Sequence, residues 1–228
     1  MKRCIPIFLM IIILIFTSCR TTEEDVNISE EDAEKAFSLL IQQSGSQAMG
    51  YVFSESDETD FLGAEYNEIN KDADKIPYMS TLLANWKEQT SSTVQLLIQN
   101  EKDSLTTLLE NQTFPSALTM IDSSLTSASE VFESQNRTII QAEIEQQLSD
   151  LIDPTIESEI LELYDSYQKI EKLNGSKTYK KISSSDVSRM AVLVTDLYFE
   201  GMKIAEKNIR TTPDLYQDPL IIKVFSLI

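Results

Sequence analysis

Apolar residues recur every three or four positions along most of this chain, which is the spacing of one face of an α-helix. Residues suited to start a helix precede several of these stretches, among them Ser29 before the first and Asp153-Pro154 before a later one. The pattern predicts long helices within residues 29–52, 78–109, 128–151, 154–173 and 185–205.

Polar and helix-breaking residues separate the periodic stretches. A break in the second helix is expected near Asn100. A further helix is expected to start at Thr113-Phe114-Pro115, with Thr113 as its cap and the proline in its first turn. Residues 54–75 are acidic and indicate a loop, with Phe61 and Leu62 as its inward anchors.

Composition supports a single helical domain. Only five glycines occur in 228 residues, which argues against turn-rich β architecture and against glycine-rich phosphate loops. The chain has no obvious internal repeat and no linker long enough to divide it. We therefore predict one all-α, multi-helix domain over residues 29–228, with bundle-like or orthogonal packing.

The beginning of the chain has a different pattern. Two cationic residues are followed by an apolar run from Ile5 to Phe16, which ends just before Cys19. The run holds about a dozen residues, whereas a helix that crosses the hydrocarbon core of a membrane needs roughly twenty. This pattern predicts a bacterial lipoprotein signal peptide, and an uncleaved membrane anchor is the alternative.

Cleavage of this signal would remove residues 1–18 and leave Cys19 as the lipid attachment site, with residues 19–28 as the lipidated end and a polar tether. Phe16 stands where the motif usually has leucine, so an ordinary thiol at Cys19 is the second interpretation. Lipidation predicts a cell-envelope protein that faces the periplasm or the cell exterior. Cys4 leaves with the signal, so the mature chain can form no internal disulfide.

The charge of the chain restricts its partners. The formal charge of −18 becomes −20 without the signal, because the signal contains Lys2 and Arg3 and no acids. Binding to a phosphate backbone needs clustered Lys and Arg, so nucleic acid is not an expected partner. The simplest role of the acidic surface is to keep an exported domain soluble.

The residue types present limit the chemistry of any active site. The chain has no histidine, which removes the commonest general base and metal ligand, and a Ser-His-Asp triad with them. Asn70, Asp72 and Asp74 match the first ligand positions of an EF-hand loop. Lys75 replaces the required glycine, however, and Thr81 replaces the final glutamate. We predict no metal, no cofactor and no enzyme activity.

Aromatic residues and the tail are expected to belong to the core. Trp86, Tyr164 and Tyr167 are spaced as core residues. The tail from Leu220 to Phe225 is apolar except for Lys223, and it would promote aggregation if it were exposed. We expect the tail to pack on the domain with Lys223 reaching solvent, and a partner-binding motif is the alternative.

The last long helix and the tail also resemble a known family. The segment Glu206-Lys207-Asn208-Ile209-Arg210, followed by Pro213 and the tail, is similar to the closing segment of the bacterial domain of unknown function family 4197. Residues 194–199 resemble that family's preceding helix, with Leu197 in place of a glycine, and residues 113–132 resemble its middle segment. The matching positions that are candidate site residues are Asp196, Phe199, Glu206, Arg210 and Phe225.

The resemblance implies an all-helical exported domain, and it implies no activity. The family's Asn-Arg-Ala-Ala-Glu motif falls near residues 91–95, where the arginine and the glutamate are both absent, so no role of that charged pair is carried over. From the sequence, Arg210 is expected to pair with a nearby acid at the surface, where ion pairs stabilise a fold little.

The function predicted from these observations is binding or scaffolding by a non-catalytic, lipid-anchored envelope protein. The expected partners are the membrane, through the lipid on Cys19, and an unidentified envelope protein or apolar ligand. One alternative is a carrier that holds an apolar or amphipathic ligand between helices, which requires a cavity of roughly several hundred Å³. The other is a carboxylate-based hydrolase, which requires two acids desolvated together in a cleft.

Overall fold

The computed structural model describes residues 28–55, 67, 69–152, 154–171 and 184–226. Every regular element in these ranges is a helix, so the all-α prediction is confirmed. The long helices are α2 (Glu30–Glu55), α4 (Met79–Glu110), α6 (Ser127–Leu151), α7 (Pro154–Glu171) and α8 (Ser184–Thr211). The short ones are η1 (Ala73–Lys75), α5 (Ala117–Ile121), η2 (Pro213–Tyr216) and α9 (Pro219–Phe225).

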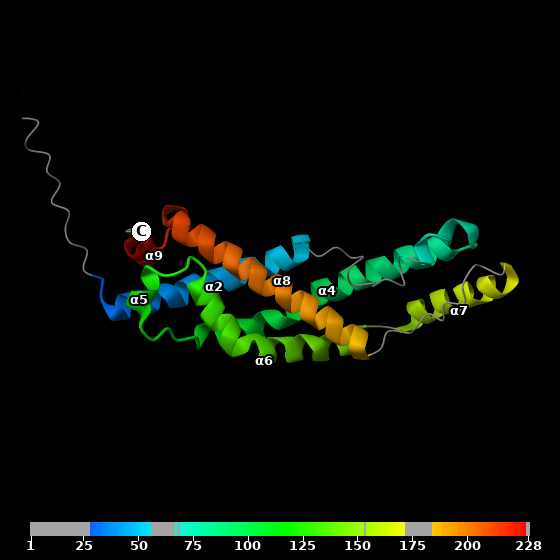
Figure 1. Ribbon diagram of the computed structural model, residues 1–228, viewed down its shortest axis with the longest axis horizontal. Helices are drawn as coiled ribbons and strands as arrows, with labels where there is room; N and C mark the ends of the chain where they lie inside the picture. The colour runs from blue at the N-terminus through cyan, green and yellow to red at the C-terminus, as the bar shows by residue number, and fades with distance from the viewer. Residues whose placement is uncertain (1–27, 56–66, 68, 153, 172–183, 227–228) are drawn as a thin grey trace, which may run out of the picture.

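Most of the helices pack into one unit, which we call the body. Helix α2 packs along α8, and α6 packs along α8 as well (Figure 1). Helices α6 and α8 are antiparallel, because Ser188 near the start of α8 bonds to Glu145 near the end of α6, and Glu206 near the end of α8 meets the start of α6. The carboxyl-terminal half of α4 packs on α2 and α6, and α5, η2 and α9 close one end of the body.

A second, smaller unit projects from the body at the opposite end from α5 and α9 (Figure 1). It consists of η1, the amino-terminal part of α4, and α7, and we call it the arm. Helix α7 packs on α4, and η1 covers the start of α4. The arm has a hydrophobic cluster of its own, formed by Ile69, Ala73, Ile76, Met79, Leu82, Leu83, Trp86, Ile160 and Tyr164.

Helix α4 contributes to both hydrophobic clusters. Met79 and Trp86 lie in the arm cluster, whereas Leu97 and Leu105 lie in the body cluster. The break predicted near Asn100 is therefore wrong, because α4 is continuous through this position. Asparagine is only mildly unfavourable within a helix, and both halves of α4 gain packing partners that outweigh this local preference.

The helix ends agree with the sequence at some positions and differ at others. The backbone N–H of Asp32 donates to Ser29 Oγ over 3.1 Å, so Ser29 caps α2 as predicted. The predicted helix start at Thr113 is wrong, because α5 begins only at Ala117. Pro115 disfavours a helical conformation for Phe114, and the burial of Phe114 directs the chain inward before the helix begins. Phe61 and Leu62 lie outside the described residues.

Two glycines allow helices of the body to approach closely. A Cβ atom on Gly201 of α8 would lie 2.8 Å from Tyr51 Cβ in α2, and one on Gly45 of α2 would lie 2.6 Å from Leu109 Cδ1 in α4. A Cβ on Gly50 of α2 would have no such neighbour within 4 Å. Gly201 therefore sets the spacing of α2 and α8, because the atom it meets is next to the backbone, whereas the Leu109 methyl group near Gly45 can shift and Gly50 meets nothing.

Candidate functional site

Glu206 and Arg210, two of the family-resemblance positions, form an ion pair inside the body. Both side chains are fully buried, and Arg210 Nη1 lies 3.3 Å from Glu206 Oε1. The two residues are one turn apart near the end of α8, so the helix itself holds them on one face. The prediction that Arg210 pairs with an acid is confirmed, but its placement at the surface is wrong.

The Glu206 carboxylate caps the start of α6. It accepts a hydrogen bond from the backbone N–H of Ala128 over 3.0 Å and one from that of Ser129 over 2.7 Å. These amides belong to the first turn of α6, where the backbone N–H groups have no partner within the helix and the helix dipole favours a negative charge. Glu206 therefore fastens the start of α6 to the end of α8.

The Arg210 guanidinium binds the turn between α5 and α6. Its Nη1 donates to the carbonyl of Ser124 over 2.7 Å and to Ser127 Oγ over 3.1 Å. Its Nη2 donates to the carbonyls of Ile121 over 2.7 Å and Met120 over 3.3 Å, at the end of α5. Met120 and Ser124 also accept backbone bonds within the turn. Arg210 therefore ties the end of α5 to the turn after it.

Two aromatic rings enclose the same guanidinium. Arg210 Cζ lies 5.6 Å from the ring centre of Phe37 in α2 and 5.4 Å from that of Phe225 in α9. The two rings also meet edge to face, with their centres 5.3 Å apart. A cation against aromatic faces is attracted to them, more strongly where water is excluded. Arg210 thus joins α2, α5, α8 and α9 at one point.

The tail packs on the body, as predicted. It forms helix α9, and Asp218 caps the start of this helix by accepting bonds from the N–H groups of Leu220 and Ile221. Lys223 is partly exposed and pairs with Asp32 at the start of α2 over 2.7 Å. The side chains of α9 that are buried in the body are Ile221, Val224 and Phe225.

Burial shifts the pKa values of both Glu206 and Arg210. It raises the pKa of the Glu206 carboxyl, and the bonds from Ser129 and Ala128 and the charge of Arg210 act in the opposite direction. Burial also lowers the pKa of Arg210, which Glu206 opposes, and an arginine remains protonated in a protein. Both carboxylate oxygens accept hydrogen bonds and the side chain is fully buried, so this centre organises the fold.

Asp196 and Phe199, the other two resemblance positions of α8, meet at a second arginine. Arg137 of α6 donates from Nη2 to Asp196 Oδ1 over 2.6 Å, and its Cζ lies 5.5 Å from the ring centre of Phe199. Arg137 also bonds to Glu133, which pairs with Lys203 over 2.7 Å. Sequence reasoning missed Arg137, Glu133 and Lys203, because nothing in the periodicity of α6 shows which of its charges face α8.

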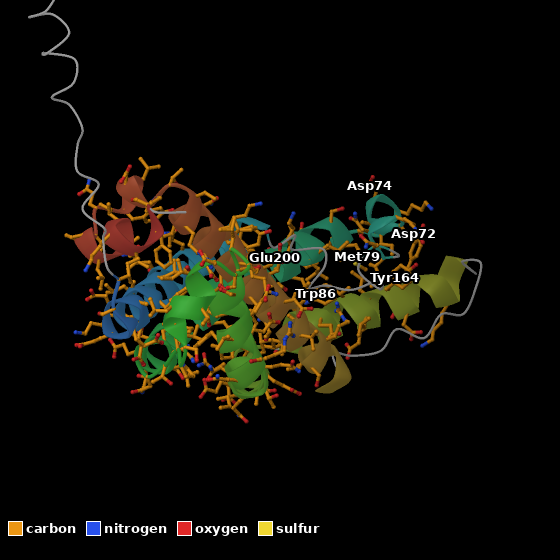
Figure 2. The ribbon with its side chains drawn as sticks, turned by 60° about the vertical axis from the view of Figure 1, so that its left-hand side comes forward. Asp72, Asp74, Met79, Trp86, Tyr164 and Glu200 are labelled. Carbon is orange, nitrogen blue, oxygen red and sulfur yellow. The ribbon has the colours of Figure 1, made fainter. Side chains whose placement is uncertain are left out.

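In the arm, the acid that resembled an EF-hand ligand is engaged in other contacts. Asp72 accepts bonds from Lys75 Nζ over 2.6 Å and from Tyr164 Oη over 3.0 Å (Figure 2). The bond from Lys75, followed by that from Tyr164, lowers the pKa of Asp72 despite partial burial. Within the described ranges, no group of three or more acid or cysteine side chains is placed to hold a metal ion. Trp86 and Tyr164 are core residues, as predicted.

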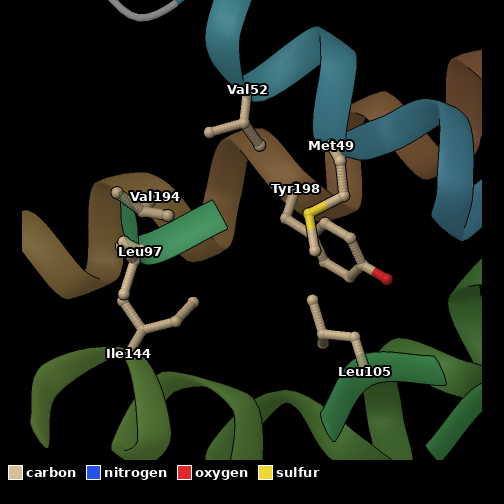
Figure 3. Close-up of a pocket in the computed structure, with 7 residues that line it drawn as sticks. All are labelled: Met49, Val52, Leu97, Leu105, Ile144, Val194 and Tyr198. Carbon is tan, nitrogen blue, oxygen red and sulfur yellow. The ribbon is translucent and has the colours of Figure 1, made fainter. Parts of the chain in front are cut away.

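A small cavity lies between the four long helices of the body (Figure 3). Its volume is about 20 Å³, which accommodates roughly one water molecule. Sites for larger ligands measure about 300–1,000 Å³. This cavity is therefore too small for the ligand that the carrier alternative requires. Its lining residues are Met49, Val52, Leu97, Leu105, Ile144, Val194 and Tyr198.

Two buried acids bear on the hydrolase alternative. Among the described residues, the buried carboxyl side chains are Glu157 and Glu206. Glu157 lies on α7 in the arm, whereas Glu206 lies near the end of α8 in the body. They do not form the close pair that a carboxylate mechanism needs. The described helices also include none with the length and apolarity required to cross a membrane.

Comparisons of the chain with protein-family models, with curated proteins and with solved structures found no match in any of the three. The resemblance to family 4197 therefore remains a prediction.

Proposed function

We propose that the chain is a lipid-anchored protein of the bacterial cell envelope that works by binding or scaffolding, without catalysis. In this proposal Cys19 carries the lipid, the body is a rigid mount, and the arm presents the surface that a partner protein contacts. The observation that carries the proposal is the separation of the arm from the body, with a hydrophobic cluster of its own.

The surface of the arm supports a contact with another protein. Four apolar side chains pack against the arm cluster and yet remain partly exposed, because α4 is the main neighbour of α7 among the described helices. Apolar surface that the fold leaves uncovered is typical of interaction sites. The partly exposed side chains are Ile156, Leu161, Leu163 and Tyr167.

Tyr78 is the strongest single candidate for such a contact. Its side chain is 63% exposed, and its backbone φ of 72° is left-handed at the position before α4. This conformation is unfavourable for an aromatic residue and costs about 1–3 kcal/mol. Stability of the fold does not account for an exposed tyrosine at a strained position, whereas contact with a partner does.

The position of the arm relative to Cys19 fits the same role. Cys19 precedes the start of α2 at Glu30 by eleven residues, and the start of α2 lies at the end of the body that α5 and α9 close (Figure 1). The arm projects at the other end. A lipid on Cys19 would therefore hold the body near the membrane and direct the arm away from it.

Site-specific cross-linking in intact cells tests this proposal. A photoreactive phenylalanine analogue replaces Tyr78 in one variant and Leu96, an exposed residue on the body half of α4, in the matched control. We expect a discrete cross-linked product from position 78 and none from position 96. We also expect the variant Tyr78→Asn to compete poorly for the partner. Asparagine tolerates the left-handed backbone, so this variant should melt at the wild-type temperature or slightly above it. Equal products from both positions would contradict a binding role for the arm.

The anchor has a separate test. Cys19→Ala is expected to abolish labelling by a fatty-acid analogue and to leave the chain uncleaved or released. Wild-type protein that sediments with membranes but takes up no label would contradict lipidation.

A further inference from the structure

We propose that the end of the body formed by α5, η2 and α9 rests on the lipid bilayer, with Leu215 inserted among the lipids. The inference rests on the proposed lipid anchor at Cys19, and it adds a defined docking face and a defined orientation to that anchor.

Leu215 is the first observation. Its side chain is 76% exposed, the highest value among the large apolar residues that the structure describes. The turn that carries it is well fixed: Pro213 beside it is buried, Tyr216 packs on the body cluster, and the N–H of Leu215 bonds to the carbonyl of Thr212 over 3.1 Å. Leu215 is thus held outward by ordered structure and is not part of a loose chain.

The place of this turn is the second observation. The turn leads into α9, and α9 is joined to the start of α2 by the pair of Lys223 and Asp32. Ile28, just before α2, packs on the body cluster at the same end. Eight residues lie between Cys19 and Ile28, and the nine Cα-to-Cα steps from one to the other span at most about 32 Å. A lipid on Cys19 therefore brings this end of the body, and not the arm, within reach of the bilayer.

A second exposed apolar side chain lies at the same end. Leu118 is on α5, which Arg210 ties to α8 beside α9. Helices α5 and α9 and the start of α2 lie together at one end of the molecule in Figure 1. Apolar side chains on a protein that is already held at a membrane gain by entering it, since full burial of one leucine favours the inserted state by about tenfold or more.

The charges at this end determine which lipid it prefers. Three acids there are engaged within the protein: Asp218 caps α9, Asp32 pairs with Lys223, and Glu31 pairs with Lys35. Exposed acids at this end include Glu30, Asp122 and Asp214, against the exposed lysine Lys207 at the end of α8. This end is therefore not attracted to anionic head groups, and its contact depends on apolar insertion into a bilayer of low charge.

Fluorescence quenching in vesicles tests the inference. The lipidated mature protein is prepared with Leu215→Cys and, as the matched control, with Tyr78→Cys, and each new thiol carries an environment-sensitive dye. The vesicles are phosphatidylcholine with or without spin-labelled acyl chains. We expect a blue shift and strong quenching at position 215, little of either at position 78, and weaker quenching at position 215 when a third of the lipid is anionic at low salt.

The other outcomes overturn the inference in distinguishable ways. Protein that floats with the vesicles but is quenched at neither position has an anchor and no docking face, which leaves the proposed function intact. Quenching at both positions means that the chain lies flat on the bilayer. A blue shift at position 215 in native envelope fragments, without quenching in protein-free vesicles, assigns Leu215 to a protein partner. Mature protein purified from the producing cells that carries no lipid on Cys19 by mass and fails to float refutes the lipid anchor itself.

Discussion

The polar contacts inside the body differ in kind from those inside the arm. In the body, Arg210 and Glu206 are fully buried and connect four helices at one point. In the arm, Asp72 and Lys75 form their pair at the surface, beside Tyr164. An ion pair in solvent adds little stability, whereas the loss of one partner from a buried pair leaves an uncompensated charge.

The difference teaches that the two units can open separately. The arm has few buried side chains and one main helix pair, so its local opening costs less free energy than opening of the body. The body, whose charged centre requires α2, α5, α8 and α9 together, opens only as a whole. We therefore expect the arm to open more readily than the body, and each unit can be perturbed by its own substitutions.

The largest effect is expected from Arg210→Met. Methionine keeps much of the side-chain volume but leaves Glu206 buried without a cation and removes the bonds to the carbonyls of Ser124 and Ile121. Breaking a buried pair in this way costs about 3–5 kcal/mol, a large part of the usual stability of a domain. Urea unfolding followed by circular dichroism should show a much lower midpoint. The control, Lys223→Met at the exposed pair with Asp32, should shift it far less, and equal shifts would contradict the distinction.

The next effect is expected in the arm alone. Trp86→Ala removes the largest side chain of the arm cluster, and such core truncations cost about 3–5 kcal/mol. Because we expect the arm to open separately, hydrogen exchange should become roughly 150–5,000-fold faster for amides of α7 and the start of α4. Amides of α8 and α9 should change by no more than about twofold. Uniform acceleration along the whole chain would show that arm and body form one cooperative unit.

A smaller effect is expected where α2 crosses α8 in the body. Gly201→Ala places a methyl group 2.8 Å from Tyr51 Cβ, an atom next to the backbone that cannot move away easily. Overpacking of this kind costs about 1–3 kcal/mol. Gly50→Ala is the matched control, since its methyl group meets nothing within 4 Å and alanine favours the helix by about 0.5–1 kcal/mol. The melting temperature should fall for the first variant and rise slightly for the second. A fall for both would show that helix spacing is not the cause.

The smallest effect is expected on the stability of the arm at low pH. The pKa of Asp72 is lowered in the folded state, so its contacts stabilise the arm above the ordinary value of 3.8, and this stability is lost as the pH falls through the lowered value. The chain has a single tryptophan, so Trp86 fluorescence reports on the arm. In Asp72→Asn the acid-dependent part of the signal should disappear, with a loss of stability several times smaller than for Trp86→Ala. If the fluorescence of Asp72→Asn changes with pH as the wild type does, Asp72 is not the cause of the acid sensitivity.

The helices could be predicted from the sequence because apolar spacing and capping residues are local properties. Ser29 as a cap and the burial of the tail both follow from short segments. The continuity of α4 did not follow, because the contacts that stabilise it near Asn100 come from helices distant in the chain.

The candidate site was predictable only in part. Glu206 and Arg210 could be singled out, yet a pair four residues apart on a helix looks like an exposed pair in the sequence. Its burial depends on the turn between α5 and α6, which lies more than 80 residues earlier. The strain at Tyr78 carried no signal either, since a left-handed backbone is expected at glycine or asparagine.

The pairing of α9 with α2 also sets the timing of folding. Lys223 and Asp32 are 191 residues apart, and contacts between such distant positions form slowly. At about 5–20 residues per second, synthesis places α9 roughly 10–40 s after the start of α2. During that interval Phe225 and Arg210 are missing, and the body cannot close around them. If the chain is exported as proposed, it gains from this delay, because it stays unfolded enough for translocation until nearly all of it has been made.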